Sequence, residues 1–434
     1  MDLLYANDTA GQHPRSWYAE TAQTLPPFAP LDGETRVHVC IVGGGFTGLS
    51  AALHLAELGV EVLLVEAHRA GFGASGRNGG QLGSGQRVNQ LGLEKMLGAD
   101  AARTLWDMGA DAKALVRRLI AEHDIACHLK DGIALAGSTQ AQVDDLHRYA
   151  DHLATAYDYA PVEALDAKSF AALCPSPDYT GGMLDMGAGH LHPLALCFGL
   201  AQAAVAAGAR ICEDTHVKSI ARGDPAILMT DKGRIVADHV ILAANGYLGG
   251  LDAQVASRVM PINNFVVATE RLGERAAEVL TRDIAVSDSR FVVNYFRLSH
   301  DKRLLFGGGE SYGYRFPSDI AAKVRKPMMQ IFPSLRDVAI THAWGGTLAI
   351  TMKRMPYLTR LAPNVLSASG YSGHGVGNAV QAGALMAQAV RGQADGFDTM
   401  SAIPSVPFPG GVRLRNPLLA LAMSWYALRD RLGT

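Results

Sequence analysis

The chemistry that this sequence can support is most evident in a glycine-rich turn. The residues from Gly43 to Gly48 read G-G-G-F-T-G and match the spacing G-x-G-x-x-G. An apolar, β-branched segment, 37–42, precedes the turn, and an Ala- and Leu-rich segment, 49–58, follows it. A strand, a tight turn and a helix in this order let the backbone approach a pyrophosphate, which the free N–H groups of the helix N-terminus can bind. We therefore expect a dinucleotide site that includes Gly43, Gly45, Phe46, Thr47 and Gly48.

A carboxylate follows at the position that such a site requires. The second apolar segment, 60–65, has the composition of a buried strand and ends at Glu66. This is roughly 20 residues beyond the first glycine, where an acidic side chain accepts hydrogen bonds from the adenosine ribose. Strand, turn, helix, second strand and terminal acid coincide, which favours a dinucleotide site over a purely structural turn.

A second glycine-rich stretch helps to distinguish FAD from NAD. Residues 71–81 read G-F-G-A-S-G-R-N-G-G-Q. Such a backbone can pass close to a bulky planar ring and offer N–H donors, whereas a nicotinamide-binding unit usually returns soon to helix and strand. A flexible surface loop is the alternative explanation. We expect FAD, with further contacts from Ala67, Gly73, Ala74, Ser75, Arg77, Asn78, Gly79, Gly80 and Gln81.

Together these motifs resemble the D-amino-acid-oxidase-like superfamily of FAD-dependent amine and amino-acid oxidoreductases, over most of the chain. The loop at 71–81 looks like that of its gamma-glutamylputrescine oxidase branch. Segments 208–217 and 240–246 resemble later parts of the superfamily's FAD domain, and 370–377, G-Y-S-G-H-G-V-G, resembles its C-terminal flavin-binding turn. The resemblance implies cofactor contacts from Val217, Gly246, Gly373, His374, Gly375 and Val376, although His374 could instead hydrogen-bond within its own turn.

Several groups found in other branches of the superfamily are missing. Sarcosine-oxidase-like relatives attach the flavin to a cysteine near 344–351, but the last cysteine of this chain is Cys212, so we expect non-covalent FAD. An informal alignment places Leu348 where relatives carry an arginine for the substrate carboxylate, and Gly377 where the sarcosine type carries a lysine. A buried carboxylate needs such a partner, so a substrate that reacts at a plain amine fits better. Other candidate anchors for a carboxylate, each equally able to form a surface salt bridge, are Arg77, Arg297 and Arg354.

The resemblance implies an enzyme that oxidises a C–N bond to an imine, which water hydrolyses to an aldehyde, with O2 reduced to H2O2. Its substrate would be gamma-glutamylputrescine or a related amine. One alternative is an FAD-dependent oxidase or dehydrogenase of a cyclic or D-amino acid, such as L-pipecolate, that passes electrons to a quinone. Another is a flavin-carrying or tRNA-binding module without turnover. The residues expected to line the reactive face, each also able to serve as scaffold, are Tyr295, Arg297, Trp344 and His374.

Composition sets limits on the partners. The chain has 434 residues, 48% of them hydrophobic and 18% charged, and a net charge of -2. These values are typical of a folded enzyme that acts on a small molecule, and they argue against a nucleic-acid partner. The cysteines are spread widely, and His190 and His192 would point to opposite faces of an extended segment, so neither a disulfide framework nor a metal site is expected.

No segment of the sequence is expected to cross a membrane. The first residues have an early acid and no apolar core, so they do not resemble a secretion signal, and we expect a cytoplasmic protein. The apolar stretch 191–209 includes His192, Pro193 and Gln202 and favours a buried helix. Another helix, expected over 417–432, would pack on the protein's own body or on a second subunit of a homo-oligomer, with a membrane surface as the alternative.

The order of these elements predicts an α/β fold with two domains. The first would be a Rossmann-like FAD-binding domain with a parallel sheet, built from 36–90, 187–250 and 340–392. The second would be an α+β substrate domain on a mixed or antiparallel sheet, built from 91–186 and 251–339, with strands at 263–269, 291–296 and 303–308. Residues 1–35 would form an irregular surface arm, and 393–434 a C-terminal extension with a helix.

Overall fold

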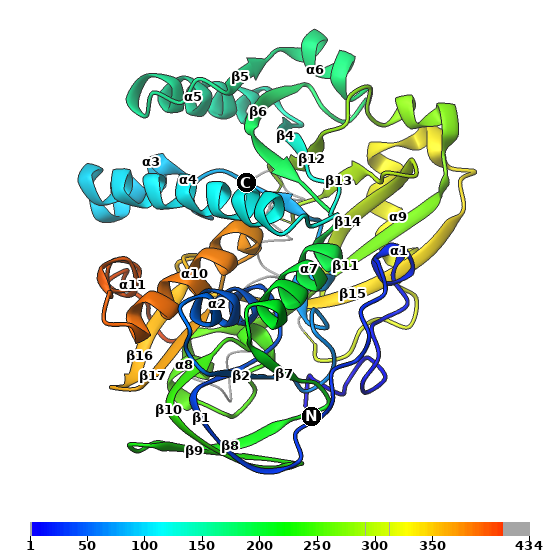
Figure 1. Ribbon diagram of the computed structural model, residues 1–434. Coiled ribbons are helices and arrows are strands. Elements are labelled where there is room, and N and C mark those ends of the chain that lie inside the picture. The colour runs from blue at the N-terminus through cyan, green and yellow to red at the C-terminus, as the bar shows by residue number, and fades with distance from the viewer. Residues whose placement is uncertain (1, 291, 312, 411–434) are drawn as a thin grey trace.

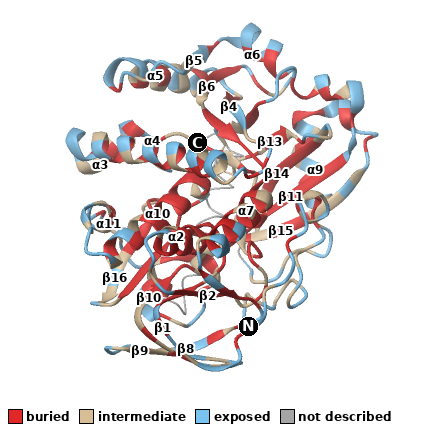
Figure 2. Cartoon of the chain, in the orientation of Figure 1, coloured by how far each residue is buried: buried red, intermediate tan, exposed pale blue. Residues whose placement is uncertain are grey.

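The computed structural model describes residues 2–290, 292–311 and 313–410, which contain two β-sheets and the helices that cover them. Figure 1 places the first sheet at the bottom of the molecule and the second at the upper right. Three helices occupy the centre: α2 (Phe46–Glu57), α7 (Pro193–Ala206) and α10 (Gly375–Val390). Buried residues follow the strands and these central helices, as Figure 2 shows in red.

The first sheet is built on parallel strands, as the sequence predicts. Its order is β16-β17-β10-β1-β2-β7, in which the five strands from β17 to β7 are parallel, while β9 and β8 extend it from β10 as an antiparallel ribbon. The central strand β1 is buried along its second half, which accounts for the apolar run before the glycine turn. The strands are β1 (Gly33–Val42), β2 (Val62–Val65), β7 (Arg210–Cys212), β8 (Val217–Ala221), β9 (Ala226–Thr230), β10 (Gly233–Leu242), β16 (Tyr357–Ala362) and β17 (Val365–Ser369).

Helix α2 connects the glycine turn to the second strand of this sheet. It ends before Gly59, whose φ of +73° is the left-handed conformation expected of a helix-terminating glycine. Nearly all residues of α2 are buried, because α7 and α10 pack against it. The buried helix expected within 191–209 is confirmed as α7.

The second sheet is mixed, as expected. Its order is β15-β11-β14-β13-β12-β4-β6-β3, with β5 paired to β6, and β12 and β4 form its parallel pair. The strands are β3 (Gln81–Leu82), β4 (Lys130–Gly137), β5 (Val162–Leu165), β6 (Gly181–His190), β11 (Met260–Arg271), β12 (Ala285–Asp288), β13 (Tyr295–Leu298), β14 (Arg303–Ser311) and β15 (Ile340–Ile350). The segments 81–82 and 340–350, which we assigned to the FAD-binding domain, thus pair within the second sheet. The domain boundaries themselves stay a prediction.

The remaining helices lie around these sheets. They are α1 (Trp17–Thr21), α3 (Gln90–Leu97), α4 (Ala99–Glu122), α5 (Gln140–Ala156), α6 (Ala167–Leu173), α8 (Ala253–Arg258), α9 (Ile320–Ile331) and α11 (Asp395–Ser401), with short 3-10 turns η1 (Ala74–Gly76), η2 (Asn245–Tyr247), η3 (Gly273–Glu278) and η4 (Pro333–Leu335). In the part of the chain that the structure describes, no helix is long and apolar enough to cross a membrane, and no group of three potential metal ligands occurs. The helix expected over 417–432 lies outside the described residues.

The N-terminal arm is not a surface appendage, and that expectation was wrong. Trp17 is 1% exposed and Tyr18 is 0% exposed. The Trp17 ring lies against His192, the residue that caps α7, and the Tyr18 ring lies edge-on to Trp344 of β15. The arm therefore contributes aromatic side chains to the core shared by α7 and the second sheet.

We expect Trp17→Ala to lower the free energy of unfolding by about 3 to 5 kcal/mol, because it removes a large buried side chain and leaves a cavity. Urea unfolding followed by circular dichroism would measure the change. Leu58→Ala, at a side chain that is 56% exposed, is the control. Equal unfolding midpoints for the two variants would contradict the buried position of the arm.

Candidate cofactor and active site

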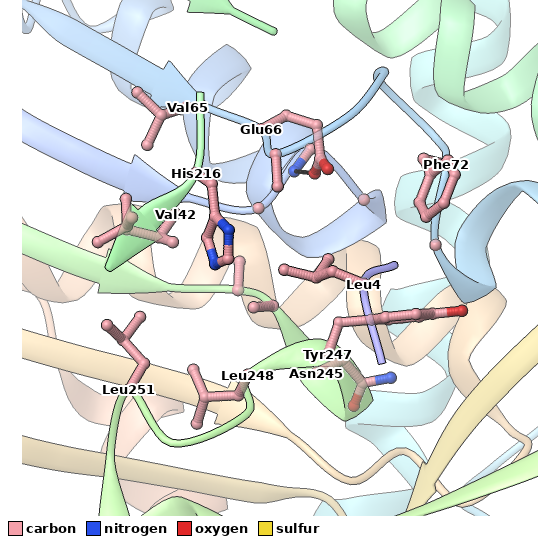
Figure 3. A pocket seen from close by; sticks show the side chains of 18 of the residues that line it. Leu4, Val42, Val65, Glu66, Phe72, His216, Asn245, Tyr247, Leu248 and Leu251 are labelled. Carbon is pink, nitrogen blue, oxygen red and sulfur yellow. Dashed lines mark hydrogen bonds between the residues drawn. The ribbon is translucent and has the colours of Figure 1, made fainter. Parts of the chain in front are cut away.

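A pocket lies at the carboxyl ends of the parallel strands β1, β2 and β10. Such a position is where open α/β sheets bind nucleotides. The space it encloses, including the part open to solvent, is about 740 Å³. Figure 3 shows Glu66, Phe72, His216 and Tyr247 around it. Of the residues predicted to bind cofactor, the structure brings together in its lining Gly43, Gly45, Glu66, Ala67, Gly73, Ala74, Ser75 and Val217.

The glycine turn has the geometry that a phosphate site needs. Gly43 has a φ of +111°, and a Cβ at Gly48 would lie 1.9 Å from the carbonyl oxygen of Gly43, so a side chain fits at neither position. The N-cap residue of α2 is Gly45, which has no side chain to cap the helix. The Phe46 N–H donates instead to Ser75 Oγ at 2.9 Å. The turn and the loop with Ser75 thus meet at the positive end of α2, where phosphate oxygens can accept hydrogen bonds.

Glu66 is held in the pocket by the backbone. Its Oε2 accepts a hydrogen bond from the Gly44 N–H at 2.7 Å, and its Oε1 accepts one from the His68 N–H at 2.9 Å. Burial raises the pKa of Glu66, and these two N–H donors oppose the shift because they stabilise the carboxylate. The carboxylate oxygens keep further lone pairs that ribose hydroxyls can use.

Sequence reasoning missed part of the pocket. Gly246 is not in the lining, but its neighbours Asn245 and Tyr247 are. The other lining residues that we did not predict come from the arm, the strand ends, the two glycine-rich segments and the segment after η2: Leu4, Val42, Gly44, Val65, Phe72, Thr215, His216, Ala243, Ala244, Leu248 and Leu251. The strand-end residues could have been inferred from their place directly after predicted strands, whereas no sequence pattern points to Leu4.

The polar side chains of the second glycine-rich loop stabilise the loop itself. Arg77 is buried; its Nε donates to the Phe72 carbonyl, and its Nη1 pairs with Asp8 at 2.7 Å. Asn78 accepts from the Gly80 N–H at 2.7 Å, and Gln81 donates to the Val286 carbonyl at 3.0 Å. Arg77 thus uses its Nε and Nη1 within the protein, and its Nη2 is buried without a hydrogen-bond partner among the described residues.

Three of the four candidates for the reactive face support the same loop from outside. Arg297 donates to the carbonyl of Gly79 at 3.0 Å, and Trp344 Nε1 donates to that of Arg77 at 3.0 Å. The Tyr295 ring lies against Gly79, and its hydroxyl donates to Asn264 at 2.6 Å. Burial raises the pKa of Tyr295, so the hydroxyl stays protonated. The scaffold role that we left open for these residues is the one their contacts support.

His374 lies at the start of α10 with its ring against Gly83. Burial lowers the pKa of His374 to about 4, and the positive charge of Arg87 acts in the same direction, so the imidazole is neutral at physiological pH. Arg87 itself was missed by sequence reasoning. Its Nε donates to the Ser372 carbonyl at 3.0 Å, its side chain is exposed, and the charges of Arg354 and Glu310 act on it.

Comparison with known proteins identifies the family. The model of the family described as FAD dependent oxidoreductase matches residues 38–389. The chain belongs to this family. It is 40% identical over 424 residues to the gamma-glutamylputrescine oxidoreductase of Escherichia coli (strain K12), covering 97% of this chain and 99% of that protein. It is 42% identical to a probable oxidoreductase OrdL of Rhizobium meliloti (strain 1021), over 96% of this chain and 97% of the relative.

The fold of this FAD-dependent oxidoreductase is also similar to solved structures. Glycine oxidase from Geobacillus kaustophilus aligns with a TM-score of 0.71 and 23% identity, covering 86% of this chain and 100% of the other. Our expectations of an α/β fold with a Rossmann-like unit, of an oxidoreductase and of FAD as cofactor are confirmed. The pocket fits that cofactor, because its glycine turn, free helix N-terminus and fixed carboxylate provide for the phosphates and the ribose.

We expect Glu66→Gln to weaken FAD binding about tenfold or more, since a neutral amide replaces a charged acceptor of ribose hydrogen bonds. Reconstitution of the apoprotein, followed by quenching of FAD fluorescence, would give the dissociation constant. Glu61→Gln, at an exposed residue directly before β2, is the matched control. The same affinity in both variants would show that Glu66 does not contact the cofactor.

We also expect acid to release all of the flavin. The five cysteines are buried, and none of them lines the described pocket. The measurement is the flavin absorbance of the supernatant after acid precipitation and centrifugation. A yellow pellet would mean a covalent bond to the protein.

Proposed function

We propose that this protein is an amine oxidase that converts a C–N bond to an imine, which water hydrolyses to an aldehyde, with O2 reduced to H2O2. The substrate is gamma-glutamylputrescine or a related amine. The observation that carries this proposal is the 40% identity, over nearly the full length of both chains, to a protein named for that substrate. When bound, FAD would supply the acceptor for the hydride equivalent that leaves the carbon next to the nitrogen.

The apolar surroundings of two positions support a substrate that reacts at a plain amine. Leu348 packs on a cluster of Met260, Ile262, Ile350 and Phe408. Gly377 lies against Leu82 and Ala112. Neither position offers positive charge, so a carboxylate next to the reacting carbon would lack a partner there. This weighs against the alternative of a cyclic or D-amino acid.

The positive charge beside the Gly373–Val376 turn belongs to Arg87, which bonds to the Ser372 carbonyl. Burial and then the positive charge of Arg354 lower the pKa of Arg87, and the negative charge of Glu310 acts in the opposite direction. Part of the Arg87 side chain remains accessible to solvent. His374 and Tyr295 are both neutral at physiological pH and add no charge to this region.

Arg87 can also select the substrate. A guanidinium group binds a carboxylate through paired hydrogen bonds, and Arg87 uses only its Nε within the described structure, for Ser372. We assign to it the carboxylate of the glutamyl group, which lies at the opposite end of gamma-glutamylputrescine from the reacting amine. Free putrescine lacks that carboxylate.

The test of the proposed activity is anaerobic mixing of the holoenzyme with gamma-glutamylputrescine, putrescine, L-pipecolate and D-amino acids while flavin absorbance is followed, and then admission of air. Bleaching by gamma-glutamylputrescine with recovery in air is the expected result. Bleaching by amino acids alone would make the amino-acid alternative correct. Recovery of the absorbance only after a quinone is added would mean that a quinone, and not O2, is the electron acceptor.

We expect Arg87→Gln to raise KM for gamma-glutamylputrescine about tenfold or more, because a hydrogen bond between charged groups is lost, and to leave KM for putrescine unchanged. Steady-state oxygen consumption with both substrates measures this split. Arg118→Gln, at an exposed residue of α4, is the control. Equal effects on the two substrates would refute a role in carboxylate binding.

A further inference from the structure

The N-terminal arm contributes to the cofactor pocket from its outer side. Residues 2–12, which we call the strap, place Leu4 in the pocket lining. In Figure 3 Leu4 lies among Glu66, His216 and Tyr247, which come from three other segments. An adenosine group bound in this pocket would therefore contact the strap as well as the Rossmann-like unit.

One imidazole ties both ends of the strap to the pocket. His68 Nε2 lies 2.8 Å from the carbonyl oxygen of Leu4, so this nitrogen must carry the proton and donate it. The N–H of Gly11 donates to His68 Nδ1 at 3.0 Å, so that nitrogen must be unprotonated. Both bonds require the neutral imidazole, and burial lowers the pKa of His68, which favours that form.

An ion pair holds the middle of the strap. Asp8 bonds to Arg77 at 2.7 Å, and the two side chains are 14% and 1% exposed. The Arg77 guanidinium lies 4.4 Å from the centre of the Phe72 ring, and the His68 ring is stacked on Phe72 at 3.8 Å. Since Phe72 lines the pocket, the strap and this wall of the pocket form one packed unit.

Two further contacts fix the strap across the opening. The Tyr5 hydroxyl lies 3.0 Å from Nδ1 of His216, which lines the pocket from the strand β8 side. Asn7 donates to the Tyr314 carbonyl at 2.8 Å and accepts from the Phe316 N–H at 2.7 Å, in the segment after β14. The strap thus connects parts of the chain that belong to different sheets.

We propose that the strap is the outer wall of the adenosine site and controls the rate at which FAD leaves the protein. The contacts of the strap must break before FAD can leave on the side of the pocket that the strap covers. The strap therefore retains FAD that is held without a covalent bond. This role concerns the cofactor alone and does not depend on the identity of the amine substrate.

The test follows FAD release from the holoenzyme as the rise in free-FAD fluorescence after dilution. Asp8→Asn removes the charged partner of Arg77 and is expected to speed release about tenfold or more. Leu4→Ala breaks no hydrogen bond of the strap and is expected to speed release about threefold or more, through the lost apolar contact. Deletion of residues 2–12 should exceed both. Glu20→Gln is the control, because Glu20 belongs to the same arm and pairs with His342 outside the strap.

The rate at which apoprotein binds FAD again distinguishes a strap that has opened from a cofactor site that has been damaged. Apoprotein of the Asp8→Asn variant should take up FAD at least as fast as the wild-type apoprotein, since an open strap also admits the cofactor. Release rates within twofold of the wild type for Asp8→Asn and Leu4→Ala would overturn the proposal, as would slower rebinding by the Asp8→Asn variant. If the deletion variant does not fold, these two point variants still decide the outcome.

Discussion

The glycine-rich segment between Glu66 and Leu82 imposes the constraint on which the remaining structure depends. It leads from the end of the first sheet into the second sheet, and each of its residues is buried or partly buried, so its carbonyl and N–H groups need partners inside the protein. Arg77, Arg297 and Trp344 provide them, each by donating to a carbonyl of this segment. Burial of the two guanidinium groups is tolerable because each makes several hydrogen bonds.

This constraint explains why distant parts of the sequence meet around one loop. Tyr18 of the arm lies beside both Trp344 and Arg297, so the arm closes the core behind the side chains that hold the loop. Asp8 balances the charge of Arg77 from the outer side. The arm, the loop and β15 are therefore interdependent, although β15 is far from the other two in sequence and the three belong to no common sequence motif.

The features that could be predicted from the sequence are those whose structure depends on residues close together in the chain. Strand, glycine turn, helix and Glu66 follow one another within about 30 residues, and their spacing depends only on how a chain approaches a pyrophosphate. The buried position of Trp17 has no such rule, because a short irregular segment shows no hydrophobic period. The same limit applies to Arg297, since the type of residue indicates a cation but not whether its partner is a substrate or a backbone carbonyl.

The site has a cofactor half, which binds FAD, and a proposed substrate half, which binds the amine, and the two depend on different features of the chain. The cofactor half relies on backbone N–H groups, glycine conformations and a single carboxylate, so very different sequences can build it. In the function proposed here, the substrate half relies on where positive charge lies. Leu348 of β15 and Gly377 of α10 carry no charge. The accessible positive charge is that of Arg87, in the segment after the glycine-rich loop. Because Arg87 bonds to the backbone beside His374, a change in this one side chain can alter which amine is accepted while the cofactor half keeps its structure.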